Sequence, residues 1–424
     1  REAEVEATAA RAQADHGLIG DARSVLATDP TEALAILKQL SPGSRELRAA
    51  RMIASEAAGA GVAHVLTADG SVRCLAFSPD GRSLASYQEE GRKIRLWDLA
   101  TWSGRELGSS PGKLLDLVLT ADTLRGIDDD GRIWAWSMSA PSAPQLVRSL
   151  DDKVEFVSAQ WSPDGTRVVA DVLETNGHIS VRVFDLKSDD RLLGEYRSPV
   201  WTTDGRAILA HDRNHSKVIR FEVATGQLTE LFDGPFHPVL AGDATHTWIG
   251  RDSRSYAPGD QNFVRELGSG RRVDLGTEVV MLVAMPGGRV VGTTSKTLAT
   301  STSETMRTQK KGQLVMFDPI ELSRGDHAVL VSDGWDGSTL RLTGHNAAVE
   351  ALAVSRTGTI ASGDRKGMIR VWTLPVVARD HGDGKTSSTF ALLERGNELV
   401  ITRRGPRLEV RDLARGATRL LEIT

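Results

Sequence analysis

A repeated pattern of three short strands most restricts how this 424-residue chain can fold. Its strongest copy, VRCLAFSPDGRSLASYQEEGRKIRLWDL, covers residues 72–99. Apolar and polar residues alternate there with a period of two, which is typical of half-buried β-strands. Pro79-Asp80-Gly81 and Glu90-Gly91 separate the runs as turns, and Trp97-Asp98 ends the third run. The segment therefore predicts a small antiparallel sheet.

Similar units recur along most of the chain. Together with the first copy they number eight, and the unit at 239–267 is the weakest. They cover residues 72–99, 114–137, 154–186, 198–223, 239–267, 279–318, 344–374 and 390–413. Short runs between them, such as QLVRSL at 145–150, are candidates for a fourth, outer strand in each unit.

The SPDG turn and the RLWDL run resemble a blade of a WD-repeat β-propeller. The resemblance implies an all-β propeller over residues 62–424. Eight blades of about 45 residues fit the usual length of roughly 40–45, so eight is favoured and seven is the alternative. Either 63–70 or the C-terminal ATRLLEIT could supply the strand that closes the ring, and the sequence leaves both open.

The same resemblance implies structural roles for several residues. A complete WD repeat links a His, a Ser or Thr, an Asp and a Trp by hydrogen bonds. His345, Ser362 and Trp372 match three of these positions, but Lys366 holds the place expected for the Asp. We therefore expect no unit to have the whole network. Three tryptophans are expected to pack between adjacent blades: Trp97, Trp136 and Trp372.

Residues 1–61 differ in composition from the rest of the chain and are predicted to form helices. Good helix formers dominate from Glu2 to Ala27. Asp29 is a plausible N-cap for a second helix with Pro30 at its first position, and Ser44 could cap a third. The segment resembles one tetratricopeptide-like hairpin plus a helix. It predicts either a linker with a solvated face or a partner-binding groove.

Composition and motifs argue against several functions. The formal net charge of −4 disfavours general nucleic-acid binding, and Cys74 is the only cysteine. No apolar run is long enough to insert into a membrane, and no secretion signal is evident, so we expect a cytoplasmic chain. Phosphate-loop, dinucleotide, nucleophile-elbow and zinc-protease motifs are missing. We therefore predict no catalytic residue, no cofactor and no metal.

Charged turns on one propeller face are the predicted partner-binding surface. Acidic residues in the early units and basic residues in the late ones suggest a face divided into two arcs of opposite charge. Two tryptophans in predicted loops are further interface candidates. The predicted set is Glu89, Glu90, Asp128, Asp129, Asp130, Arg365, Lys366, Arg403, Arg404, Trp102 and Trp335.

These features favour a non-enzymatic scaffold or sensor that binds a protein or peptide on the propeller face. The junction DPTEALAILKQL…AARMIASEAAGAGVAHVL…AFSPDG is similar to bacterial Ser/Thr kinase–WD-repeat fusions and sensor ATPases. That similarity implies, as an alternative, a regulatory region of a signalling protein whose catalytic domain lies upstream. A propeller-type hydrolase is a second alternative. The apolar inner-strand runs LDLVL, MLVAM and ALAV disfavour it, because they bring no polar set together.

Overall fold

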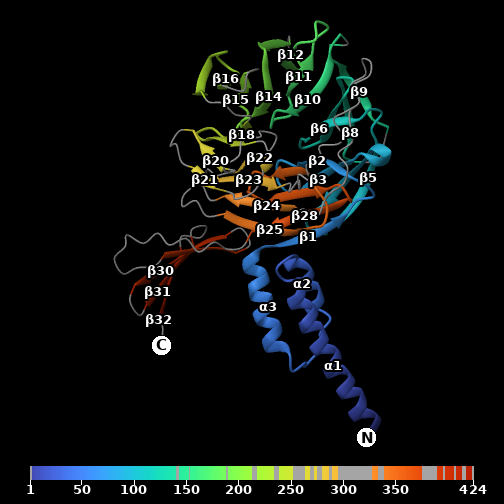
Figure 1. Cartoon of the computed structure of the whole chain (residues 1–424), viewed down its shortest axis with the longest axis vertical. Coiled ribbons are helices and arrows are strands. Elements are labelled where there is room, and N and C mark those ends of the chain that lie inside the picture. The colour runs from blue at the N-terminus through green and yellow to red at the C-terminus, as the bar shows by residue number, and fades with distance from the viewer. Residues whose placement is uncertain are drawn as a thin grey trace, which may run out of the picture.

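In the computed structural model, the described residues form three α-helices and eight four-stranded antiparallel sheets (Figure 1). The structure describes residues 2–139, 143–151, 153–187, 190–212, 217–233, 238–251, 263–267, 272–274, 279–285, 289–294, 327–332, 339–374, 389–394, 397–404, 407–412 and 417–422.

The helices come first in the chain and the sheets follow. The helices are α1 (Glu2–Val25), α2 (Pro30–Leu37) and α3 (Leu47–Ala60). The first three sheets comprise β2 (Val72–Phe77), β3 (Ser83–Gln88), β4 (Lys93–Asp98), β5 (Ser103–Ser109); β6 (Leu114–Leu119), β7 (Thr123–Asp128), β8 (Arg132–Ser137), β9 (Gln145–Ser149); and β10 (Glu155–Trp161), β11 (Arg167–Leu173), β12 (Ile179–Asp185), β13 (Arg191–Gly194). A short 3-10 turn, η1 (Glu90–Arg92), connects β3 to β4.

The next three sheets follow the same plan. They comprise β14 (Tyr196–Trp201), β15 (Ala207–Asp212), β16 (Lys217–Glu222), β17 (Leu228–Asp233); β18 (Pro238–Gly242), β19 (Thr247–Arg251), β20 (Phe263–Glu266), β21 (Arg272–Asp274); and β22 (Val279–Met285), β23 (Arg289–Thr294), β24 (His327–Ser332), β25 (Thr339–His345). The last two comprise β1 (Val62–Thr67) with β26 (Val349–Val354), β27 (Ile360–Asp364), β28 (Met368–Thr373); and β29 (Thr389–Glu394), β30 (Asn397–Arg404), β31 (Arg407–Asp412), β32 (Ala417–Glu422).

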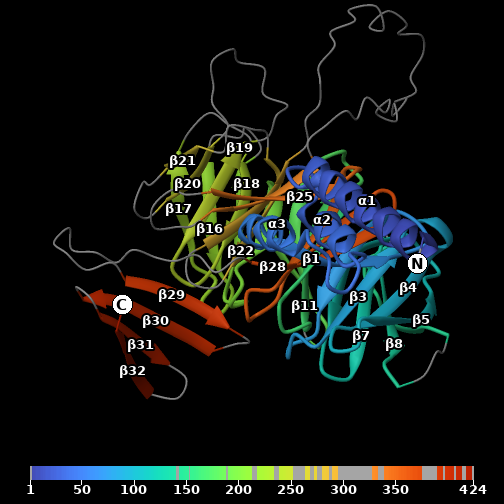
Figure 2. The ribbon, with the colours of Figure 1, turned by 90° about the horizontal axis from the view of Figure 1, so that it is seen from below.

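The inner strands of successive sheets contact one another in a circle. The contacts run from β2 to β6, β10, β14, β18, β22 and β26, and then back to β2. Strand β1 pairs with β28, so the N-terminal strand completes the sheet that also holds β26 and β27. The choice that the sequence left open therefore falls on the N-terminal strand. Figures 1 and 2 show the sheet β29–β32 lying to one side of the others.

Burial differs from strand to strand within each sheet. The second strands β3, β11, β15 and β27 are buried along nearly their whole length, whereas the outer strands β9, β13 and β17 are mostly exposed or half-buried. A second strand is covered on both faces because neighbouring sheets pack against each side of it. The alternation in residues 72–99 predicts half-buried strands, whereas β3 is buried at five of its six positions.

Tryptophans fill the spaces between sheets, as predicted. Trp97 packs with residues of β1, β26 and β28, and Trp136 packs with Cys74 and Ala76 of the preceding sheet. Trp372 packs with residues of β22 to β25. Each of these side chains is at most 5% exposed, so each buries a large apolar area between two sheets.

One predicted strand is misplaced. The unit at 279–318 was expected to end at Phe317-Asp318, which lies outside the described residues. The third strand of this sheet is instead β24, with the sequence HAVLVS, and it is buried at every position. Its apolar, valine-rich sequence suits a strand that is covered on both sides.

The helical head, residues 2–60, packs on the closing sheet. Ile19 and Ala22 of α1 meet Ala50 and Ile53 of α3 in a small core. Asp29 caps α2 as predicted, because its carboxylate accepts the N–H groups of Thr31 and Glu32. The third helix begins at Leu47 and not after Ser44, whose hydroxyl accepts the N–H of Glu46 in the preceding turn.

Candidate functional site

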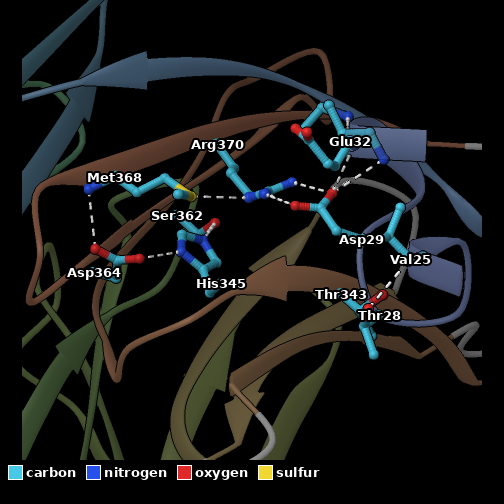
Figure 3. A network of polar contacts seen from close by, with 12 residues as sticks. Val25, Thr28, Asp29, Glu32, Thr343, His345, Ser362, Asp364, Met368 and Arg370 are labelled. Atoms are coloured by element: carbon cyan, nitrogen blue, oxygen red, sulfur yellow. Dashed lines mark hydrogen bonds and ion pairs between the residues drawn. The ribbon is translucent and has the colours of Figure 1, made fainter. Parts of the chain in front are cut away.

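A buried chain of hydrogen bonds lies between β25, β27 and β28 (Figure 3). The carboxylate of Asp364 accepts the Nδ1–H of His345 at 2.8 Å. The Nε2 atom of His345 then accepts the hydroxyl of Ser362 at 2.7 Å, and the Ser362 oxygen accepts the Nε1–H of Trp372 at 2.7 Å. The unit at 344–374 has the complete His, Ser, Asp and Trp network, with His345 at the end of β25 and the other three residues in the closing sheet. The prediction that no unit keeps the whole network is therefore wrong.

The error lay in the position assigned to the aspartate. Asp364 comes two residues before Lys366, at the end of β27, and its Oδ1 also accepts the N–H groups of Lys366 and Met368. The carboxylate thus closes the β27–β28 turn and holds the histidine at the same time. Lys366 is exposed in that turn. From the sequence alone, the distance to Gly367 does not show whether position 364 or position 366 is the aspartate position of the repeat.

The order Ser, His, Asp is also that of a hydrolase triad, but the environment here is different. The side chains of His345 and Asp364 are fully buried, and Ser362 is fully buried. The Ser362 oxygen already accepts the Trp372 indole, and burial lowers the pKa of His345. A nucleophile must reach its substrate and its base must take up a proton. A buried Ser362 beside a buried His345 does not meet these requirements. We therefore assign the network a structural role, which is to hold the β27–β28 turn and Trp372 in place.

Other sheets keep parts of the network. Ser86 accepts the Nε1–H of Trp97 at 2.9 Å and the side-chain amide of Gln88 at 2.7 Å. Asp128 ends β7 as Asp364 ends β27, and it accepts the Nε1–H of Trp134 at 2.7 Å. The indole nitrogen of Trp136 has no hydrogen-bond partner among the described residues, because Gly126 stands where Ser362 stands in the other sheet.

Asp128 therefore does not belong to the exposed charged face. Its side chain is fully buried, and it also accepts the N–H of Arg132 at 2.7 Å. Burial raises its pKa. The run Asp128-Asp129-Asp130 combines one buried structural aspartate with two exposed ones. The sequence pattern did not separate them, because an aspartate before a tight turn is common on the surface as well.

Charges in the β3–β4 and β27–β28 turns are joined by ion pairs. Glu89 lies 2.5 Å from Nε of Arg73 and 2.8 Å from Nζ of Lys113. Glu350 lies 3.4 Å from Arg73 and 3.0 Å from Arg365. A continuous series of alternating charges thus crosses three neighbouring sheets. These charges largely compensate one another, so the proposed arcs are weaker here than a count of residues implies.

The remaining charged candidates fall into two groups. Asp129, Asp130 and Lys366 are exposed, and Asp130 pairs with the neighbouring Arg132 at 2.6 Å. Glu90 is exposed and accepts the N–H of Ser71. Arg403 and Arg404 lie in β30, in the sheet that Figure 1 shows apart from the others.

The two loop tryptophans also differ. Trp335 lies outside the described residues. Trp102 is half-buried and stacks on the ring of His64, with ring centroids 3.6 Å apart and an interplanar angle of 10°. Its φ is +57°, a left-handed conformation that is rare for a bulky residue. It therefore links the β4–β5 turn to the closing strand β1.

Sequence reasoning missed the contact that joins the head to the sheets. The guanidinium of Arg370 in β28 faces the Asp29 carboxylate, with Nη1 and Oδ1 3.1 Å apart and a second contact between Nη2 and Oδ2. Arg370 is 2% exposed. Nearby, the hydroxyl of Thr31 accepts the N–H of Ala63 at 3.0 Å. Asp29 and Arg370 are 341 positions apart in the sequence, so no local pattern could reveal their ion pair.

Two further groups, the half-buried Asp116 and the buried Cys74, have shifted proton affinities. Burial raises the pKa of the Asp116 carboxyl in β6 to about 7, although its oxygen accepts the N–H of Trp161 at 2.8 Å. Burial raises the pKa of the Cys74 thiol.

Within the described part of the chain, no group of three or more His, Cys, Asp or Glu residues could hold a metal ion. Among the helices that the structure describes, none is long and apolar enough to cross a membrane.

Comparison with known families agrees with this geometry. Residues 62–98 and 337–373 match the family described as WD domain, G-beta repeat (WD40). With the circle of four-stranded sheets, these matches define the class of the molecule as a propeller built from such repeats. The chain is a WD40-repeat β-propeller protein. A search of curated proteins finds no significant match. Propellers of this family are generally protein-interaction scaffolds and are typically not catalytic.

Proposed function

We propose that this chain is a non-enzymatic scaffold that binds a protein or peptide partner on the face formed by the β3–β4, β7–β8 and β27–β28 turns. The observation that carries the proposal is the separation of exposed charge on this face. Lys366 lies on the closing sheet, and Asp129 and Asp130 lie two sheets further around the circle. The ion pairs of Arg73, Glu89 and Glu350 occupy the space between them.

Such a surface suits a polar partner that must dock in one orientation. Opposite charges at its two ends would steer a partner of complementary charge and fix its register, and this contribution weakens with salt. Arg403 and Arg404 belong to the prediction made from sequence but lie in a different sheet, so we place the binding face on Lys366, Asp129 and Asp130. A role in signalling beside a kinase or ATPase stays a prediction.

The experiment is a pull-down of the full chain from source cells with mass spectrometry, followed by association kinetics with the captured protein. Asp129→Lys with Asp130→Lys, and separately Lys366→Glu, should lower the association rate at least threefold at low salt. Glu56→Lys changes an exposed charge on α3 and serves as the matched control. Equal rates and equal salt dependence for all three variants and the unaltered chain would refute the proposal.

We also propose that the ring has seven blades, with the sheet β29–β32 outside it. The circle of inner-strand contacts from β2 to β26 and back supports this number. A chain that ends at Leu374 should then unfold as cooperatively as the full chain. Loss of its cooperative transition in urea would place β29–β32 inside the ring.

A further inference from the structure

The outer edge of β1 differs from the outer edges of the neighbouring sheets. Strands β5, β9, β13, β17 and β25 each pair with their inner neighbour through a register shift. Such bulges twist an edge away from further pairing. Strand β1 pairs with β28 in unbroken register from Val62 to Thr67, as β21 and β32 do with their neighbours. Unlike those two strands, its sequence VAHVLT holds no Lys, Arg, Asp or Glu. Neither a bulge nor a charged residue therefore protects the edge of β1.

The backbone groups of Val65 and Thr67 point away from β28. Ala68 donates its N–H to Gly367 across the sheet, whereas Ala63 donates its N–H outward to Thr31 of α2. Backbone groups alternate along a strand, so the odd-numbered residues of β1 direct theirs to the free edge. The helix thus occupies the edge at Ala63 and leaves Val65 and Thr67.

Side chains beside this free stretch form two distinct surfaces. Val65 is 44% exposed, and Thr67 is exposed. Side chains alternate between the two faces of a strand, so His64 lies on the opposite face, where it stacks on Trp102. An extended segment added to this edge would therefore meet an apolar side chain on one face and a rigid aromatic pair on the other.

A lysine lies beside this edge, whereas Asp69, which follows the strand, is paired with Lys93 and Arg95. Lys38 is exposed and caps the end of α2. Burial, and to a lesser extent the charge of Lys38, lowers the pKa of His64. A strand that carries a carboxylate near Lys38 would gain a complementary ion pair. A second copy of β1 brings no carboxylate within the strand, and the Asp69 that follows the strand already pairs with Lys93 and Arg95. The chemistry favours a partner segment over self-association.

We propose that the free edge of β1 binds an extended, acidic peptide segment of a partner protein by strand addition. The peptide backbone pairs with Val65 and Thr67, an apolar side chain packs on Val65, and a carboxylate lies near Lys38. This mode of binding takes its affinity from main-chain hydrogen bonds and its specificity from alternate side chains. The inference rests on the proposed scaffold function but uses a different surface from the charged face.

The probe is a library of capped seven-residue peptides displayed against the full chain. Selected peptides should alternate apolar and polar residues and contain a Glu or Asp. Val65→Pro removes an outward N–H without removing a bond to β28, since proline is tolerated on edge strands. It should weaken binding at least tenfold. Lys38→Glu lies outside the strand and should weaken acidic peptides at least threefold while sparing their Gln counterparts.

Val65→Thr keeps the edge N–H and is the control for the backbone, and thermal melts check that each variant folds. Amide exchange at Val65 and Thr67 should slow when peptide binds. Unchanged binding by a folded Val65→Pro variant, or selected peptides without acidic residues, would overturn the proposal. So would a concentration-dependent dimer abolished by Val65→Pro, which would make a second copy the occupant. If peptide binding were weakened only by Asp129→Lys with Asp130→Lys, the scaffold function would stand and the site on β1 would be refuted.

Discussion

The ion pair between Asp29 and Arg370 should decide whether the helical head is part of the folded ring or an appendage to it. Arg370 is 2% exposed and Asp29 is 22% exposed, so removal of Asp29 strands a buried guanidinium. Breaking a buried pair costs roughly 3–5 kcal/mol, and loss of an N-cap costs roughly 0.5–2 kcal/mol. Since Asp29 is partly solvated, we expect Asp29→Ala to lower the free energy of unfolding by about 3 kcal/mol, taking the lower end of the first range.

Two further variants separate the contributions to that loss. Asn is as good an N-cap as Asp, so Asp29→Asn keeps the cap of α2 and removes only the charge, with an expected loss of about 2 kcal/mol. Arg370→Met replaces the buried charge by an apolar side chain of similar length. Because replacement of both partners of a buried pair is often nearly neutral, Asp29→Asn combined with Arg370→Met should be less destabilising than Asp29→Asn alone.

The assay is urea unfolding of the full chain, followed by far-ultraviolet circular dichroism and tryptophan fluorescence. The four proteins of the double-mutant cycle give the coupling free energy, which should be about 2 kcal/mol for contacting, buried partners. In each variant, the unfolding transitions seen by the two signals should shift to lower urea together, because the head and the closing sheet unfold as one unit. A coupling below about 0.5 kcal/mol, as for distant sites, would refute the reasoning, as would a fluorescence transition that Asp29→Ala leaves unchanged.

Three other predictions concern the core and its response to pH. Ser362→Ala removes two hydrogen bonds and leaves the Trp372 indole without its acceptor, so urea unfolding should show a loss of about 2–3 kcal/mol, at roughly 1 kcal/mol or more per bond; a loss under 0.5 kcal/mol would contradict the structural role. Gly363→Ala places a Cβ 2.4 Å from Cγ1 of Val72 and should cost about 1–3 kcal/mol in urea unfolding. Gly17→Ala in α1 meets no atom within 4 Å and should stabilise the chain by about 0.5–1 kcal/mol in the same assay. Asp116 has a folded-state pKa raised to about 7 from 3.8, so the folded protein binds its proton more tightly, and this residue makes stability fall as pH rises from about 4 to 7; Asp116→Asn should flatten that slope, and an unchanged slope would show that the carboxyl titrates normally.

Much of the fold could be predicted from short-range pattern. The alternation in 72–99, the tight turns and the recurring tryptophans indicated the sheets and the slots of Trp97, Trp136 and Trp372 between them. The N-cap at Asp29 could also be predicted from the sequence, because capping depends on residues two and three positions away. These features share one physical cause: strands, turns and caps are set by neighbours along the chain.

Only the tertiary structure decided which distant residues meet and which charges are buried. The pairing of β1 with β28, the Asp29–Arg370 contact and the choice of Asp364 over Lys366 depend on segments brought together by ring closure. Asp128 and Asp129 are adjacent and chemically identical, yet one closes a buried turn and the other faces solvent. Burial arises from packing between sheets that lie far apart in sequence, and a local pattern contains no record of that packing.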